Sequence, residues 1–293
     1  METVTIRVPA TSANLAVGFD VLGIALGLYN TLTFTPAEEL SFSGCDTAFQ
    51  NEENLAYVAY ARVWQELRRS EIPPVRIHIQ ADIPVCRGLG SSAALIAAGA
   101  SAANIMAGKP FDRRQLLALT TEIEGHPDNL APALLGGLTA SMMAGGQVYT
   151  VEYLPHPELR FVALSPDFTL STHDARRVLP AMVSHSDAVR NSGCLAVLLR
   201  ALEVGDEDLI ATSLHDRLHQ PYRRRLIPEY DRIEALAGQN GCQSVCISGA
   251  GPTILCITRD TEFAQRMTRA VQPLEHHWQV RDLPIDYHGA VKL

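Results

Sequence analysis

The segment "GLGSSAA" (residues 88–94) places two glycines and two serines directly before a run of small apolar residues that continues to Met106. The run predicts a buried helix. Glycines at its entrance let several backbone N–H groups turn toward one point, and the free amides of a helix start suit a phosphate group. Ser91 and Ser92 could cap this helix or reach a metal ion. Taken alone, such a loop is more typical of packing and capping than of nucleotide binding.

Two well-known phosphate loops are missing from the sequence. The pattern G-x-x-x-x-G-K-S/T is excluded because Lys109 is followed by Pro110, and no G-x-G-x-x-G follows a strand. A nucleotide at residues 88–92 would therefore be gripped by another arrangement.

Two further segments gather small and polar residues at expected chain reversals. "PATSANLAVGFD" (9–20) follows a strand pattern, and "SGAGPT" (248–253) joins two apolar runs. The ordinary interpretation of the first is a turn with side-chain capping, and that of the second is a tight hairpin connection. Each segment alone predicts a turn.

Together and in this order, "PATSANLAVGFD", "IPVCRGLGSSAA" (83–94) and "SGAGPT" resemble the three shared motifs of the GHMP kinases, the superfamily that includes galactokinase and mevalonate kinase. The resemblance spans nearly the whole chain. Ala16 stands where the first motif commonly has glycine, and Cys86 stands where the second usually has a smaller residue.

Three other segments resemble the members of this superfamily that phosphorylate the amino acid L-homoserine. They are "EGHPDNLAPALLGG" (124–137), "LSTHDARRVLP" (170–180) and "QPYRRRLIPEY" (220–230). The resemblance implies an ATP-dependent kinase that makes O-phospho-L-homoserine for threonine synthesis. Two alternatives stay open: a kinase for another small alcohol, and a non-catalytic ligand sensor on the same scaffold.

The middle motif implies the ATP site, because in this superfamily it wraps the ATP phosphates with backbone amides at a helix start. Ser92 and Glu124 match ligands of Mg²⁺, an ion that prefers oxygen ligands and keeps several waters and phosphate oxygens. Carried over residue by residue, the ATP site comprises Ile83, Pro84, Val85, Cys86, Arg87, Gly88, Leu89, Gly90, Ser91, Ser92 and Ala93.

Four residues match positions that would hold the charged ends of the amino acid. Asn14 and Asp20 would bind its amino group and backbone end. Arg176 and Arg223 would clamp its carboxylate, because a planar guanidinium can make paired charge-assisted hydrogen bonds.

Asn129 and Thr172 match positions near the reacting hydroxyl, so they are candidate catalytic residues as well as substrate-binding residues. Neither accepts a proton as a carboxylate does. Some relatives have aspartate at the position of Asn129, so this chain points to catalysis by alignment and charge stabilisation, with the proton lost to solvent or phosphate. Asp128 is a candidate base by residue type only.

The elements that must position these residues follow from apolar periodicity, capping patterns and glycine or proline breaks. In the first half we expect strands at 3–8 and 75–80, helices at 54–69, 93–106 and 113–125, and a buried helix and strand between 130 and 146. In the second half we expect strands at 160–165, 243–248, 253–258 and 278–287, and helices at 173–204, 206–218, 228–238 and 261–272.

This mixture of strands and helices without strict βαβ alternation favours an α+β protein. The proline-punctuated segment "YLPHPELR" (153–160) predicts a boundary between domains 1–155 and 156–293. The resemblance implies the two-domain GHMP kinase fold. Its N-terminal α/β domain contains a left-handed βαβ crossover, its C-terminal domain is a ferredoxin-like α+β sandwich, and the active site lies between the two.

The composition limits the class of protein. Of 293 residues, 47% are hydrophobic and 19% charged, which predicts a globular core. The net charge of −8 argues against general binding to nucleic acid or anionic membranes. No signal peptide or membrane span is recognised, and six cysteines without metal spacing predict reduced thiols in a cytoplasmic protein. The resemblance is compatible with a homodimer that takes L-homoserine and ATP.

Overall fold

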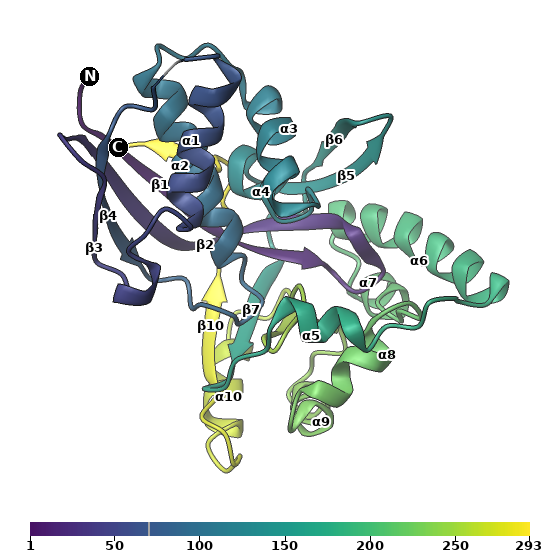
Figure 1. Cartoon of the computed structure of the whole chain (residues 1–293). Coiled ribbons are helices and arrows are strands. Elements are labelled where there is room, and N and C mark those ends of the chain that lie inside the picture. The colour runs from purple at the N-terminus through teal and green to yellow at the C-terminus, as the bar shows by residue number, and fades with distance from the viewer. Residues whose placement is uncertain (70) are drawn as a thin grey trace.

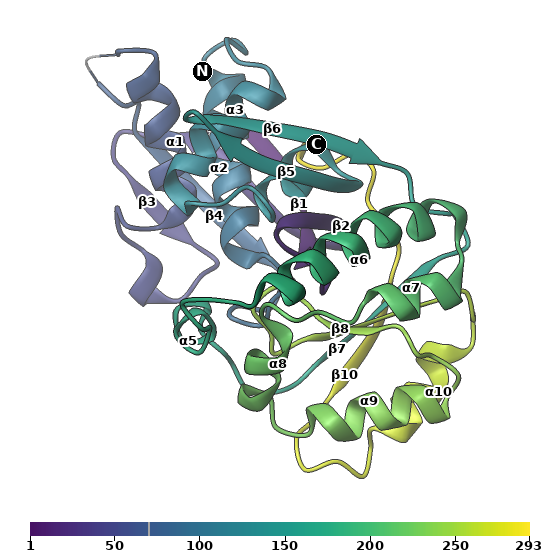
Figure 2. The same ribbon diagram turned by 90° about the vertical axis from the view of Figure 1, so that its right-hand side faces the viewer.

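Two β-sheets organise the chain in the computed structural model, which describes residues 1–69 and 71–293 (Figures 1 and 2). The first sheet has the strand order β11-β1-β2-β4-β3, with β5 attached to β2 and β6 to β5. All its neighbouring pairs are antiparallel except β3 and β4, which are parallel. Its strands are β1 (Val4–Asn14), β2 (Gly18–Pro36), β3 (Ser41–Ser43), β4 (Val75–Ala81), β5 (Leu138–Ala144), β6 (Gln147–Tyr153) and β11 (Val291–Lys292).

Four helices accompany the first sheet, and α1 and α2 bury a large apolar core against it. Side-chain caps begin α1 and α3. The Asn54 side chain accepts from the backbone N–H of Ala56, and Asp112 and Gln115 form the reciprocal capping box. The helices are α1 (Leu55–Glu66), α2 (Ser91–Met106), α3 (Arg113–Glu124) and α4 (Leu130–Leu135), with a 3₁₀ turn at Thr47–Phe49.

The second sheet has the order β10-β7-β9-β8 and is antiparallel throughout. With helices between β7 and β8 and between β9 and β10, this order confirms the expected ferredoxin-like arrangement. Its strands are β7 (Arg160–Ser165), β8 (Val245–Ile247), β9 (Ile254–Thr258) and β10 (Gln279–Leu283). Its helices are α5 (Thr172–Arg177), α6 (His185–Val204), α7 (Glu207–Ser213), α8 (Gln220–Arg223), α9 (Tyr230–Gln239) and α10 (Phe263–Ala270), with a 3₁₀ turn at Arg224–Leu226.

Strand β7 is buried on both faces, which explains its continuous apolar run. Phe161 and Ala163 join a core with α6, α7 and the β1–β2 hairpin, whereas Val162 and Leu164 join a core with α9 and α10. The first of these cores therefore belongs to both sheets and joins them. Figure 2 shows α9 and α10 on the far side of the second sheet from the β1–β2 hairpin.

The second half corrects several predicted boundaries. The helix expected at 173–204 is two helices, because Pro180 cannot continue α5 and Ser184 caps α6 anew. The helix expected at 206–218 ends at Ser213. Beyond it, the Asp216 carboxylate accepts hydrogen bonds from the backbone N–H groups of residues 219 and 220, which lead into the next helix. The strand expected at 278–287 ends at Leu283, where the chain leaves to join the first sheet through β11.

Strands β2, β3, β6 and β11 were not expected. Glycines at 23 and 27 interrupt the alternation of β2, and β3 is only three residues long. The six cysteines carry free thiols, as expected. Among the described helices, none combines the length and apolar character that a membrane crossing requires.

The close packing of α1 on α2 generates a stability prediction. A methyl group at Gly99 would lie 1.9 Å from the Ala56 carbonyl oxygen, so the two helices would have to separate. We expect Gly99→Ala to lower the free energy of unfolding by about 1–3 kcal/mol in urea denaturation. The control is Gly193→Ala on α6, where the methyl group meets no atom within 4 Å and should stabilise the helix by up to about 1 kcal/mol. Equal effects of the two substitutions would contradict this packing argument.

Candidate functional site

The three motif segments meet where the two sheets adjoin. The hydroxyl of Ser248 lies 2.5 Å from the Gly88 carbonyl oxygen and 2.8 Å from the hydroxyl of Ser12. The amide of Asn14 donates to the Gly249 carbonyl at 2.8 Å. These bonds tie segment 9–20 to residues 88 and 248–249, so three loops far apart in the sequence form one structure.

Glycines in the loop before α2 are required by this contact. Gly88 and Gly90 have φ values of 76° and 68°, a region that disfavours residues with a side chain. A Cβ on Gly88 would lie 2.3 Å from the Ser248 carbonyl oxygen, and one on Gly90 would lie 1.9 Å from Oγ1 of Thr11. Cys86 and Ala16 also have positive φ, at 53° and 59°, which is consistent with the smaller residues expected there in relatives.

The start of α2 presents backbone amides without a side-chain cap. The N-cap residue is Gly90, and the helix begins at Ser91. The interpretation of the two serines as caps is therefore wrong. The uncapped first turn keeps its N–H groups available for an anion.

Ser92 is joined to Glu124 at the end of α3. Its hydroxyl donates to Oε1 of Glu124 at 2.8 Å, and both side chains are half-buried. Two oxygen-bearing side chains thus lie beside the first turn of α2. Hard oxygen ligands of this kind fit Mg²⁺, which takes its remaining ligands from phosphates and water.

Asn129 lies at the same helix start. Its Oδ1 accepts from the hydroxyl of Thr11 at 2.8 Å and would lie 3.2 Å from a Cβ on Gly90. The Asn129 carbonyl is therefore occupied, and its NH₂ group donates one long hydrogen bond of 3.4 Å to Oδ1 of Asp128, which leaves its second N–H for a ligand. Gly23 in β2 permits this position, because a Cβ there would lie 1.7 Å from the carbonyl oxygen of Asp128.

Asp128 and His126 bond to each other. The Asp128 carboxylate is buried and bonds to Nδ1 of His126 at 2.9 Å and to the backbone N–H of Asn129 at 2.8 Å. The hydrogen bond to Asp128 raises the pKa of His126. Because Asp128 already receives these donors, its carboxylate orients the loop.

Asp20 and Arg176 form a two-pronged ion pair, with N–O distances of 2.8 and 3.1 Å. Both side chains remain more than a third exposed. The backbone N–H of Asp20 donates to Oδ1 of Asn14, which fixes the carboxylate beside the first motif. A cation and an anion therefore stand together at the site.

Arg223 is the largest fully buried side chain near this pair. Its guanidinium carbon lies 5.0 Å from the centre of the Phe19 ring, and that of Arg176 lies 5.7 Å from the same ring. Burial, together with the charge of Arg176, lowers the pKa of Arg223 to about 10, so Arg223 stays protonated at neutral pH. Two cations beside one ring favour an anion between them.

The structure brings together Asn14, Asp20, Arg176 and Arg223, and separately Gly90, Ser92, Glu124 and Asn129. Thr172 is exposed at the first position of α5 and makes no side-chain hydrogen bond to another described residue. The assignments of all these residues stay predictions. Sequence reasoning missed Thr11 and Phe19, although both lie inside the quoted first motif.

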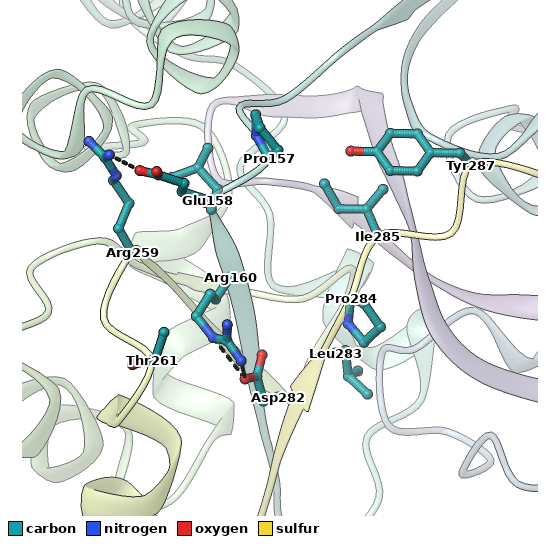
Figure 3. A pocket seen from close by; sticks show the side chains of 11 residues that line it. Pro157, Glu158, Arg160, Arg259, Thr261, Asp282, Leu283, Pro284, Ile285 and Tyr287 are labelled. Carbon is teal, nitrogen blue, oxygen red and sulfur yellow. Dashed lines mark hydrogen bonds and ion pairs between the residues drawn. The ribbon is translucent and has the colours of Figure 1, made fainter.

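A cavity of about 740 Å³ lies elsewhere, beside β7 and β10 (Figure 3). Arg160 forms an ion pair with Asp282, and Arg259 forms one with Glu158, so the charged groups in its lining pair with one another. None of the predicted site residues lines it. This cavity is therefore separate from the loops described above.

Comparison with known proteins gives the class. The family described as "GHMP kinases N terminal domain" matches residues 54–137 of this chain. The family described as "GHMP kinases C terminal" matches residues 198–274. The chain belongs to the GHMP kinases.

Within that superfamily, several homoserine kinases are similar to this chain over nearly their full length. The one from Clostridium botulinum is 42% identical over 291 residues, covering 98% of each chain. The one from Nostoc is 42% identical over 305 residues, covering 99% of each chain. A crystal structure of homoserine kinase from Cytophaga hutchinsonii matches with a TM-score of 0.91 at 27% identity, covering 100% of this chain and 98% of that chain. The expected kinase class and two-domain fold are confirmed.

Proposed function

We propose that this protein transfers the γ-phosphoryl group of ATP to the side-chain hydroxyl of L-homoserine and makes O-phospho-L-homoserine for threonine synthesis in the cytoplasm. The observation that carries this proposal is the Asp20–Arg176 ion pair beside the buried Arg223. Homoserine carries an ammonium and a carboxylate on one carbon. Asp20 would take the ammonium, while Arg176 and Arg223 would take the carboxylate.

The hydroxyl end of the substrate would then point toward the helix start. Asn129 and Gly90 both contact Thr11, which places the Asn129 amide beside the proposed phosphate loop. Its NH₂ group would orient the hydroxyl oxygen for attack on the γ-phosphorus. A bond forms between that oxygen and phosphorus, the bond to the ADP oxygen breaks, and the hydroxyl proton leaves to solvent or phosphate.

Positioning is sufficient for this reaction, because phosphoryl transfer has a loose transition state with little demand on the nucleophile. Ser92 and Glu124 would hold Mg²⁺, which neutralises charge on the phosphate oxygens. Within residues 1–69 and 71–293, no three His, Cys, Asp or Glu side chains gather as a metal site. A metal here would thus depend on phosphate and water ligands.

The direct test incubates the purified protein with ATP, Mg²⁺ and each of several candidate alcohol substrates, and measures the release of ADP. We expect a clear preference for L-homoserine over mevalonate and galactose, because only an amino acid matches the charged pair. A preference for mevalonate or a sugar would favour the alternative kinase, and the absence of any turnover would favour a ligand sensor.

Arg176→Lys tests the carboxylate clamp. A lysine cannot make the paired bonds of a guanidinium, so we expect a loss of about 1.5–3 kcal/mol in kcat/KM for homoserine, mostly as a higher KM, with little change for ATP. Arg177→Lys on the same helix is the matched control, since the Arg177 side chain is 71% exposed. An unchanged KM for homoserine would remove Arg176 from the site.

Glu124→Gln tests the metal site. The neutral amide keeps the size of the side chain but weakens an oxygen ligand, so we expect kcat to fall by about 10- to 100-fold and more Mg²⁺ to be needed. Glu122→Gln, an exposed position on the same helix, should behave like the unsubstituted protein. Normal turnover of the Glu124 variant across a magnesium titration would contradict the assignment.

A further inference from the structure

His219 is completely buried and lies directly before α8, one helical turn ahead of Arg223. The backbone N–H of Arg223 donates to the His219 carbonyl at 3.0 Å. Residues four apart on a helix share one face, so the two side chains lie together. No motif accounts for His219.

The hydrogen bonds of His219 determine its protonation state. Nδ1 lies 3.2 Å from Nη1 of Arg223, which can only donate, so Nδ1 must be the acceptor. The ring proton is therefore on Nε2, which donates to the Ala16 carbonyl at 2.7 Å. Burial lowers the pKa of His219 to about 4. The carboxylate of the nearby Asp216 accepts hydrogen bonds from the backbone N–H groups of residues 218–220. His219 is a neutral imidazole.

This neutral ring helps fix the guanidinium of Arg223. Nη1 donates to His219 and, at 3.1 Å, to the Gly249 carbonyl, while Nε donates to the Ala175 carbonyl at 3.1 Å. Within the described residues, Nη2 makes no hydrogen bond. The Arg223 guanidinium is thus held through Nε and Nη1, and Nη2 is left to donate to an incoming carboxylate.

The same ring supports the aromatic surface beneath both arginines. His219 stacks on Phe19 with ring centres 4.9 Å apart and planes 23° apart. Phe19 in turn lies 5.0 Å from the Arg223 guanidinium and 5.7 Å from that of Arg176. His219 therefore contacts one predicted carboxylate ligand directly and the other through Phe19.

We propose that neutral His219 is a positioning residue that aims Nη2 of Arg223 at the carboxylate of the substrate. The proposal rests on the proposed function, because it assumes an amino acid substrate. His219 acts through its Nδ1 acceptor and does not itself touch the substrate.

The test compares three substitutions that separate the two ring nitrogens. His219→Asn can keep an acceptor near Nδ1, His219→Gln can keep a donor near Nε2, and His219→Leu keeps neither. We expect the Gln and Leu variants to raise KM for homoserine by about 10- to 150-fold, the worth of a charged hydrogen bond, with kcat and KM for ATP nearly unchanged. We expect the Asn variant to retain most of the affinity. His215→Asn, at an exposed position in the same segment, is the control.

A second readout separates positioning from a merely structural role. The ratio of kcat/KM for L-homoserine to that for 3-aminopropan-1-ol, which lacks the carboxylate, measures what the clamp contributes. We expect this ratio to fall in the Gln and Leu variants and to recover in the Asn variant. A lower Tm with an unchanged ratio would overturn the proposal for His219 alone. A wild-type protein that does not phosphorylate homoserine would overturn the proposed function, and this inference with it.

Discussion

The close approach of three loop backbones is the constraint on which the rest of the site depends. Segments 9–20, 83–93 and 248–253 come from both sheets, and Ser248 joins them through the carbonyl of Gly88 and the hydroxyl of Ser12. The lack of a side chain at Gly88 permits this contact, because a Cβ there would collide with the Ser248 carbonyl. The same junction leaves the amides of α2 uncapped and places the first motif beside the arginines. The proposed phosphate and substrate sites thus both depend on one packing arrangement.

One anion and two cations stand together at the proposed substrate site. Asp20 and Arg176 neutralise each other when no ligand is present, and the buried Arg223 keeps its charge although burial lowers its pKa. The proposed zwitterionic substrate would satisfy all three groups, since its ammonium matches Asp20 and its carboxylate matches the two arginines. Asn129 adds a donor and no base, so the proposed catalysis depends on placing the reactants.

Local chemistry and resemblance account for what the sequence could predict. The caps at Asn54 and Asp112 depend on neighbours within three residues. The resemblance of the three motifs to those of the GHMP kinases implied that their loops share one site. The Asp20–Arg176 pair joins residues 156 positions apart, so no local pattern reveals it. His219 precedes a helix of only four residues, too short for periodicity. The break at Pro180 was missed because helical residues resume soon after it.

The central claim is that a zwitterionic substrate replaces the ion pair between Asp20 and Arg176. A crystal structure with L-homoserine and a non-hydrolysable ATP analogue tests it most directly. The account predicts the substrate carboxylate on Arg176 and on Nη2 of Arg223, its ammonium on Asp20, and its hydroxyl between Asn129 and the γ-phosphate at the start of α2. An intact Asp20–Arg176 pair with homoserine bound elsewhere would contradict it.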